Sequence, residues 1–302
     1  MNNDLLKEEI LKVKKEKNAI ILAHNYQTLD IHEIADIVGD SFQLAKIAEG
    51  IKSNIIVFCG VKFMAETAKL INPNTKVLLS AGDAGCPMAD MASYEDLKKF
   101  KDEHPDYLIV CYVNSSIEVK SLCDVCVTSS NAVRIVNKLD KNKKIMFVPD
   151  KNLGHYVKIK TNRSIDLWDG MCPIHHLFFT IDDIKSKRIT YPDHKIIVHP
   201  ECTPEVVALA DFVGSTKELA DFMADNDKAV IGTELGLVEM LIQKYPQKSI
   251  IPLSNKAICQ NMKKTSLNEV FETLKNEINE ITISDEIAIN AIKPIKMMLE
   301  LN

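Results

Sequence analysis

The sequence has no long apolar run and no stripe of basic residues, and both absences narrow the possible functions. No apolar run approaches the roughly 20 residues that a membrane-spanning helix needs. The first twenty residues, MNNDLLKEEILKVKKEKNAI, lack the unbroken apolar core of a signal peptide. The 302 residues carry a formal net charge of −5, which argues against nucleic acid and anionic membranes as partners. We therefore expect a soluble, cytoplasmic protein.

The cysteines lack the pattern of a disulfide framework or of a structural zinc site. The chain has 8 cysteines, but the cytosol keeps thiols reduced. Only Cys123 and Cys126 form a CxxC pair, and no second pair stands at zinc-finger spacing. Cys59 and Cys111 lie within apolar runs, as is typical of small buried hydrophobic residues.

Short apolar, β-branched runs alternate with segments of helical spacing along the whole chain. The runs read AIILAH, NIIVFCG, KVLLS, YLIVCYVN, KIMFVPD, KIIVHP, KAVIGT and SIIPLS. Segments such as DIHEIADIVGDSFQLAKIAEG, between the first two runs, carry apolar residues at helical spacing. This alternation predicts an α/β protein whose parallel sheets are covered by helices on both faces.

Three landmarks recur three times each: a residue that ends a strand, a hydroxyl residue at a helix start, and a cysteine in a loop. They are His24, Tyr112 and His199; Ser41, Ser129 and Thr216; and Cys86, Cys172 and Cys259. Within each set, successive members lie 86 to 88 positions apart. The general likeness of βαβ units explains one matching pair, but not three landmarks that keep this interval twice over.

The repeat predicts three similar αβα units with parallel sheets in a pseudo-threefold arrangement around a central active-site cavity. We expect the first unit, with an N-terminal helix, at residues 1–104 and the second at 105–190. The third, with the C-terminal helices, would cover 191–302. This arrangement would bring the three landmarks of each kind to one axis.

The converging residues suggest both an anionic ligand and a metal. Hydroxyl residues at helix starts suit a small substrate with phosphate or carboxylate groups, although a single such residue is typical of an ordinary N-cap. Three converging thiolates leave a tetrahedral metal one ligand short. They suit a cubane iron–sulfur cluster with one iron open to substrate, where it acts as a Lewis acid. A catalytic zinc on three cysteines remains the competing interpretation.

The stretch His199-Pro200-Glu201-Cys202 adds acid–base groups to this cavity. His199 and Glu201 lie two residues apart at a strand end, so both can project from it. A histidine and a carboxylate beside a Lewis acid are what proton abstraction and dehydration need. Taken alone, the stretch also fits a capped helix with a structural histidine.

Several motifs, taken together, closely resemble the quinolinate synthase family of the A type, over roughly residues 18–272. These motifs are AHNYQ, GDS, TSSNA, CPIHH, HPECTPEVVALADFVGST and CQNMKKTSLNEV. The resemblance implies condensation of iminoaspartate with dihydroxyacetone phosphate to quinolinate, with loss of phosphate and water, in de novo NAD biosynthesis. It also implies one 4Fe–4S cluster on Cys86, Cys172 and Cys259 with one open iron.

The resemblance further implies a set of residues that contact substrate. They are His24, Tyr26, Ser41, Tyr112, Asn114, Ser129, His175, His199, Glu201, Ser215 and Thr216. We expect Glu201 to be the principal acid–base group, with His199 and Tyr26 next. His175 is chosen over His176 because the family's histidine lies three residues after the second cysteine.

Other interpretations remain at this stage. Some relatives carry a CxxCxxC redox switch near the C-terminus, which this chain lacks. Cys123 and Cys126 are favoured as a structural pair shielded from solvent, and a regulatory disulfide between them is the alternative. A diphthamide-type radical enzyme shares the three-unit plan and the three-cysteine cluster but cleaves S-adenosylmethionine. A non-catalytic iron–sulfur sensor would need a docking surface rather than an enclosed polar ring.

The family's pathway also implies that an aspartate-oxidising enzyme supplies iminoaspartate.

Overall fold

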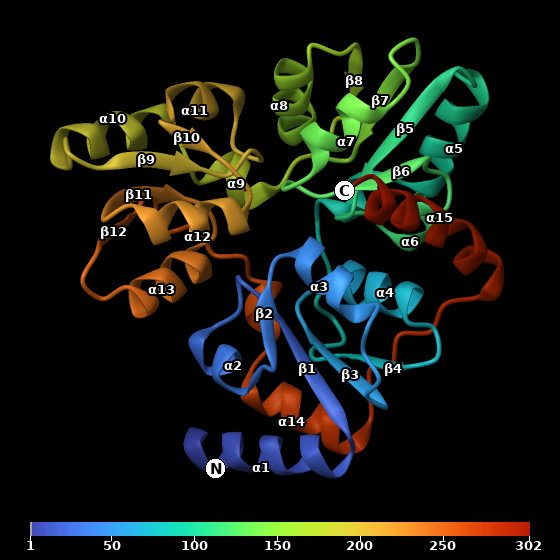
Figure 1. Cartoon of the computed structure of the whole chain (residues 1–302), viewed down its shortest axis with the longest axis vertical. Helices are drawn as coiled ribbons and strands as arrows, with labels where there is room; N and C mark the ends of the chain where they lie inside the picture. The colour runs from blue at the N-terminus through green and yellow to red at the C-terminus, as the bar shows by residue number, and fades with distance from the viewer. Residues whose placement is uncertain (1) are drawn as a thin grey trace.

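The computed structural model describes residues 2–302, which form three units around a common centre (Figure 1). Each unit holds one four-stranded sheet in which every strand pair is parallel. The strand orders are β2-β1-β3-β4, β6-β5-β7-β8 and β10-β9-β11-β12, so one topology occurs three times. Helices flank each sheet. The predicted α/β fold with three similar αβα units is confirmed.

The first unit forms because its two central strands are almost wholly apolar. All five residues of β3, Ile55–Cys59, are buried, as expected for a parallel strand covered on both faces. The other elements of this unit are α1 Asn3–Glu16, β1 Ala19–His24, α2 Leu29–Ile34, β2 Ile37–Gly39, α3 Ser41–Ala48, α4 Lys62–Ile71, β4 Lys76–Leu79 and the 3₁₀ turn η1 Ala89–Met91.

The second unit repeats this order, and its first two helices begin at serine caps. The Ser93 hydroxyl accepts the Asp96 amide and the Ser116 hydroxyl accepts the Val119 amide, which satisfies orphan donors at each helix start. Its elements are α5 Tyr94–Glu103, β5 Tyr107–Tyr112, α6 Ile117–Lys120, β6 Val125–Val127, α7 Ala132–Lys138, β7 Lys144–Val148, α8 Lys151–Thr161, β8 Ile165–Leu167 and α9 Pro173–Leu177.

The third unit is the same arrangement followed by two further helices. Pro204 occupies the first turn of α11, where its missing N–H costs no hydrogen bond. The elements are α10 Ile181–Thr190, β9 Lys195–Val198, α11 Pro204–Leu209, β10 Phe212–Val213, α12 Thr216–Asp225, β11 Lys228–Gly232, α13 Leu235–Lys244, β12 Ser249–Pro252 and the 3₁₀ turn η2 Met262–Lys264. The last two helices are α14 Leu267–Asn276 and α15 Asp285–Leu301.

An aspartate before the edge strand of each sheet makes the same contact in all three units. Asp36 accepts the Ile21 amide at 2.8 Å, Asp124 accepts the Ile109 amide at 2.7 Å, and Asp211 accepts the Ile196 amide at 2.8 Å. Each aspartate also donates its own amide to the carbonyl of that same partner. The repeat seen in the sequence is therefore a repeat of hydrogen bonds as well as of strands.

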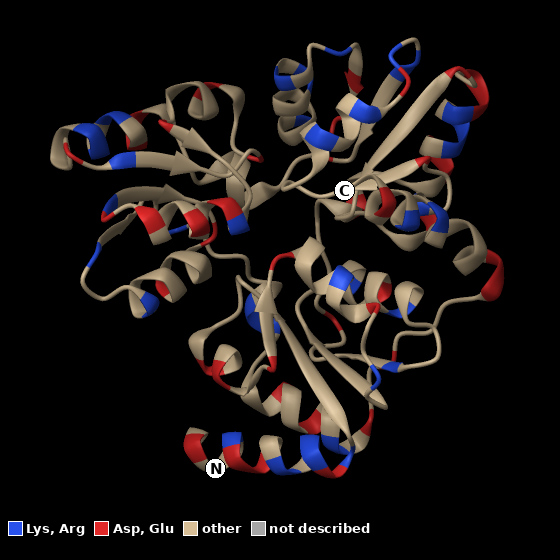
Figure 2. Ribbon diagram, viewed as in Figure 1, with Lys and Arg blue, Asp and Glu red and all other residues tan. Residues whose placement is uncertain are grey.

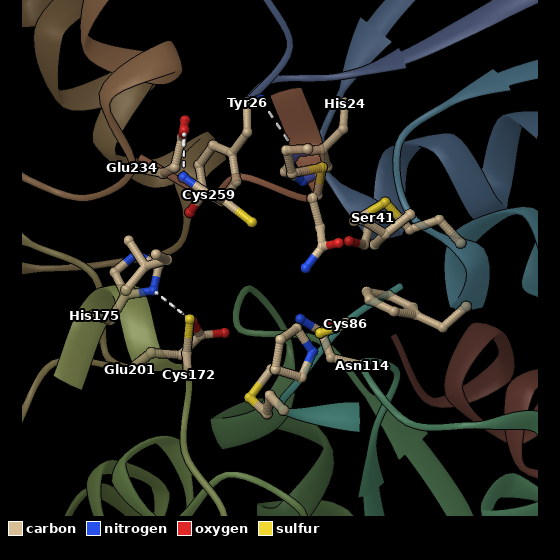
Figure 3. A pocket seen from close by; sticks show the side chains of 18 of the residues that line it. His24, Tyr26, Ser41, Cys86, Asn114, Cys172, His175, Glu201, Glu234 and Cys259 are labelled. Atoms are coloured by element: carbon tan, nitrogen blue, oxygen red, sulfur yellow. Dashed lines mark hydrogen bonds and ion pairs between the residues drawn. The ribbon is translucent and has the colours of Figure 1, made fainter. Parts of the chain in front are cut away.

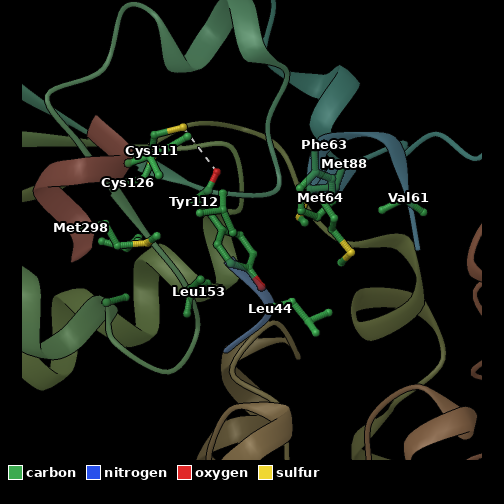
Figure 4. Close-up of a cluster of buried hydrophobic side chains, with 14 of the residues drawn as sticks. Leu44, Val61, Phe63, Met64, Met88, Cys111, Tyr112, Cys126, Leu153 and Met298 are labelled. Carbon is green, nitrogen blue, oxygen red and sulfur yellow. Dashed lines mark hydrogen bonds between the residues drawn. The ribbon is translucent and has the colours of Figure 1, made fainter. Parts of the chain in front are cut away.

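The two C-terminal helices, which the sequence division grouped with the third unit, pack against the other two units. α14 lies against α1 and the first sheet, and α15 lies against α6 and β6 of the second unit (Figure 1). The largest core cluster is correspondingly shared: Leu44, Cys126 and Met298 belong to it and come from the first unit, the second unit and α15 (Figure 4). The C-terminal segment thus joins the units.

Charged residues of both signs are interspersed over the outer helices in the view of Figure 2. Within residues 2–302, no helix combines the length and the apolar character needed to cross a bilayer.

Candidate functional site

A cavity of about 220 Å³ lies where the three units meet. Figure 3 shows side chains that line it, projecting inward from all three units. Of the residues predicted from the sequence, the lining includes His24, Tyr26, Ser41, Cys86, Tyr112, Asn114, Ser129, Cys172, His175, His199, Glu201, Thr216 and Cys259. Ser215 and His176 are not part of the lining.

The three cysteines enter the cavity from corresponding loops, one in each unit (Figure 3). In each unit, the first amide of the helix after the third strand bonds to the carbonyl two residues before the cysteine. These bonds are Lys62 to Ala84, Lys151 to Gly170 and Leu235 to Ala257, all at 2.8 Å. Burial raises the pKa of all three thiols, that of Cys86 to about 12. A bound cation would be needed to convert them to thiolates.

His24 and His199 are buried, neutral imidazoles, and the same backbone contact fixes the tautomer of both. The amide two residues further on donates to Nδ1, from Tyr26 at 3.1 Å and from Glu201 at 3.3 Å. Burial lowers the pKa of both histidines to about 3. Because Nδ1 accepts, the ring proton is on Nε2, and each ring is a hydrogen-bond donor through that atom.

Glu201 is a buried carboxylate, with 3% of its surface exposed, surrounded by hydrogen-bond donors. Tyr112 donates its hydroxyl to Oε1 at 2.6 Å, and His175 Nδ1 lies 2.6 Å from Oε2. Burial alone would raise the pKa of the Glu201 carboxyl, but His175 and the hydrogen bonds from His175 and Tyr112 hold it below its ordinary value. The group is therefore ionised and can accept a proton.

A continuous hydrogen-bonded chain crosses the cavity wall between units. It runs from the Tyr26 hydroxyl to Thr233 Oγ1 (2.9 Å), from there to His175 Nε2 (3.1 Å), and through His175 Nδ1 and Glu201 to the Tyr112 hydroxyl. Burial raises the pKa of both tyrosines well above the ordinary value, so both phenols stay protonated. Within this chain the Glu201 carboxylate only accepts, whereas the Thr233 hydroxyl and His175 Nε2 can each donate or accept.

The hydroxyl residues Ser41, Ser129 and Thr216 follow equivalent capping positions. In the first and third units the caps are Asp40 and Ser215, each in a reciprocal capping box. In the second unit the Thr128 amide donates to Asn131 Oδ1 at 2.7 Å. The capping boxes contain the same contact, in which the side chain three residues further on accepts the amide of the capping residue. In the third unit the two roles are separate, because Ser215 caps the helix and Thr216 lines the cavity; in the other two units Asp40 and Thr128 line the cavity as well.

Replacing Ser215 by alanine should lower the free energy of unfolding by about 1 kcal/mol, the ordinary worth of an N-cap. The Ser215 hydroxyl is buried and accepts the Glu218 amide, so its loss leaves that amide without its partner. Chemical denaturation measures the change. Thr216→Val is the comparison variant, because Thr216 lines the cavity and Ser215 does not. We expect Thr216→Val to raise KM more than Ser215→Ala does. The reverse order of effects on KM would contradict this assignment.

Four buried polar residues of the site were not found from the sequence. Thr233 links Tyr26 to His175, and Asn152 donates to the Glu201 carbonyl at 2.9 Å. Asp150 and Glu234 accept the amides of Cys172 at 2.9 Å and Cys259 at 3.1 Å. All four residues follow the third strand of a unit, β7 or β11, within a few positions. Since strand ends converge on the cavity, this placement could have identified them as candidate site residues.

The CxxC cysteines are buried and reduced in this structure. The Cys123 thiol donates to the Val119 carbonyl at 3.1 Å, and Cys126 lies opposite Cys111 in the pairing of β5 and β6. A regulatory disulfide between Cys123 and Cys126 stays a prediction.

The cavity contains donor atoms suited to a bound group. One atom each from Cys172, His175 and Glu201 lies within 4.8 Å of the others, a possible metal-binding group. Asn114 Oδ1 is buried without a hydrogen-bond partner, and Asn114 lines the cavity (Figure 3). An acceptor left unpaired at this depth is costly unless a ligand satisfies it. The donor set therefore fits a site that binds both a metal centre and a polar substrate.

Comparison with known proteins identifies one family. The family model described as quinolinate synthetase A protein matches residues 8–300. A quinolinate synthase of Caldicellulosiruptor bescii is 48% identical over 304 residues, and one of Alkaliphilus metalliredigens is 47% identical over 306, each covering 100% of both chains. A quinolinate synthase of Clostridium novyi is 47% identical over 296 residues, or 97% of this chain and 98% of the relative.

Proposed function

Because the chain belongs to the quinolinate synthetase A family, we propose that its central cavity forms quinolinate from iminoaspartate and dihydroxyacetone phosphate, with a 4Fe–4S cluster. The reaction releases phosphate and water and provides the pyridine ring for NAD. The observation that carries the proposal is the buried Glu201 carboxylate, which accepts the Tyr112 hydroxyl and faces the cavity that three cysteines enter.

Cys86, Cys172 and Cys259 would hold the cluster, one thiolate from each unit. The supporting observation is that three thiols from corresponding loops line one cavity together with an unpaired amide oxygen. When bound, the cluster would supply an open iron that acts as a Lewis acid.

The protein's own groups bind the substrates and move protons. Both substrates are anionic, and Ser41 and Thr216 stand in the first turn of α3 and α12, where free amides and the helix dipole favour anions. His24 and His199 donate from Nε2 to substrate oxygens. Glu201 accepts a proton from the reacting carbon, and the Tyr26 and Tyr112 hydroxyls are donors for the departing water. An aspartate-oxidising enzyme would supply iminoaspartate.

The proposal is tested by anaerobic purification, quantitation of iron and sulfide, and an assay with both substrates. We expect about four irons per chain and quinolinate formation, and both should be lost in Cys86→Ser and in Cys172→Ser. Cys202→Ser is the matched control: its thiol is buried outside the cavity lining, so iron and activity should persist.

Other outcomes would each overturn a different part of the proposal. Zinc in place of iron would keep the three cysteines as ligands but exclude the cluster. A full cluster without quinolinate would exclude the proposed reaction, and cleavage of S-adenosylmethionine by that protein would favour the radical-enzyme alternative.

A further inference from the structure

Two buried carboxyl groups tie the backbone of a cavity cysteine to the start of a helix. Asp150 caps α8 by accepting the Leu153 amide at 2.7 Å, and its other oxygen accepts the Cys172 amide at 2.9 Å. Glu234 caps α13 by accepting the Gly236 amide at 2.7 Å, and its other oxygen accepts the Cys259 amide at 3.1 Å. Both residues are 0% exposed.

The first unit lacks this arrangement. Val61 stands at the corresponding cap of α4, and within residues 2–302 no side chain accepts the Cys86 amide in the way that Asp150 and Glu234 accept those of Cys172 and Cys259. The backbone bond from Lys62 to Ala84 is nevertheless the same as in the other units. A loop of this kind can therefore form without a carboxyl group at the cap, as it does in the first unit.

Capping alone does not explain a buried carboxyl at these positions. Serine caps a helix as well as aspartate does, and burying a carboxyl is costly unless its oxygens are bonded. Here each oxygen has a separate use: one bonds the helix and the other bonds the cysteine. Glu234 also pairs with Lys263 at 3.2 Å, and Lys263 donates to the Tyr26 carbonyl, so this link continues to a residue of the reaction site.

We propose that Asp150 and Glu234 are positioning residues that fix the backbone of Cys172 and Cys259 for binding the cluster; this rests on the proposed function. By holding each cysteine amide, they set the direction of the Cα–Cβ bond and hence the place of the sulfur before the cluster arrives. Cys86 has no such tie and is the ligand whose loop can adjust. Outer partners that orient metal ligands typically contribute about 10- to 100-fold in affinity.

The test separates capping from positioning. Asp150→Ser and Glu234→Ser keep an oxygen that can cap the helix but is too short to reach the cysteine. We expect the anaerobically loaded variants to release iron to bathophenanthroline disulfonate about 10-fold or more faster than the unsubstituted protein. The electron paramagnetic resonance spectrum of the reduced cluster should change as well, a change that lost helix stability alone does not produce.

Thr180→Ala is the control, because Thr180 caps α10 in a capping box and contacts neither cysteine. It removes a cap that the serine variants keep, so it should lower stability while leaving iron release and the spectrum unchanged. Serine variants that release iron no faster than this control would overturn the proposal. If they do not fold, Asp150→Asn and Glu234→Gln allow the same comparison. Failure of the unsubstituted protein to bind iron would instead overturn the proposed function.

Discussion

Replacing Glu201 by glutamine should lower kcat by about 10²- to 10⁴-fold, the usual contribution of a positioned acid–base group. Glutamine keeps the size of the side chain and one acceptor oxygen, but it cannot take up a proton. Its NH₂ group would also face one of two donors, the Tyr112 hydroxyl or His175 Nδ1. Steady-state kinetics on the anaerobically loaded enzyme measures the loss.

Iron content should be unchanged in this variant, because the proposed cluster ligands are the three cysteines. Glu205→Gln, four residues further on at the exposed start of α11, is the matched control and should keep full activity. A kcat within about threefold of the original would remove Glu201 from the acid–base role. Loss of iron in Glu201→Gln would instead indicate that the Cys172, His175 and Glu201 group binds metal directly.

Phe147→Ala should lower the free energy of unfolding by about 3–5 kcal/mol, through lost transfer free energy and the cavity that remains. Phe147 lies in β7, is 0% exposed, and packs where α8 crosses the sheet. The approach is close: a Cβ atom at Gly154 would lie 2.9 Å from the Phe147 ring and 2.6 Å from Leu167. Because α8 already packs tightly against Phe147, the neighbouring side chains cannot easily move to fill the cavity that alanine would leave.

Denaturant unfolding of the metal-free protein measures this effect without interference from metal loss. Ile189→Ala, at a side chain that is 83% exposed, is the control and should change stability by less than about 0.5 kcal/mol. A loss below about 1 kcal/mol for Phe147→Ala would mean that the second unit rearranges around the smaller side chain.

Much of the fold was predictable because it depends on neighbours along the chain. Apolar, β-branched runs between helical segments indicated parallel strands, and the constant interval indicated three units. The same interval identified Cys86, Cys172 and Cys259 as a set, since residues at equivalent positions of a repeated strand–loop–helix unit must converge if the units surround an axis. His24, Tyr112 and His199 were found in the same way.

What the sequence by itself determined is therefore the repeated unit and the residues that recur in it. Only the tertiary structure decided the contacts between units: that Thr233 joins Tyr26 to His175, that the two C-terminal helices pack on the first and second units, and that Asp150 and Glu234 hold cysteine amides. It also decided that Ser215 caps α12 while Thr216 faces the cavity. The physical reason is that periodicity fixes which face of an element is apolar, whereas a hydrogen bond is fixed within a few tenths of an ångström by how separate elements pack.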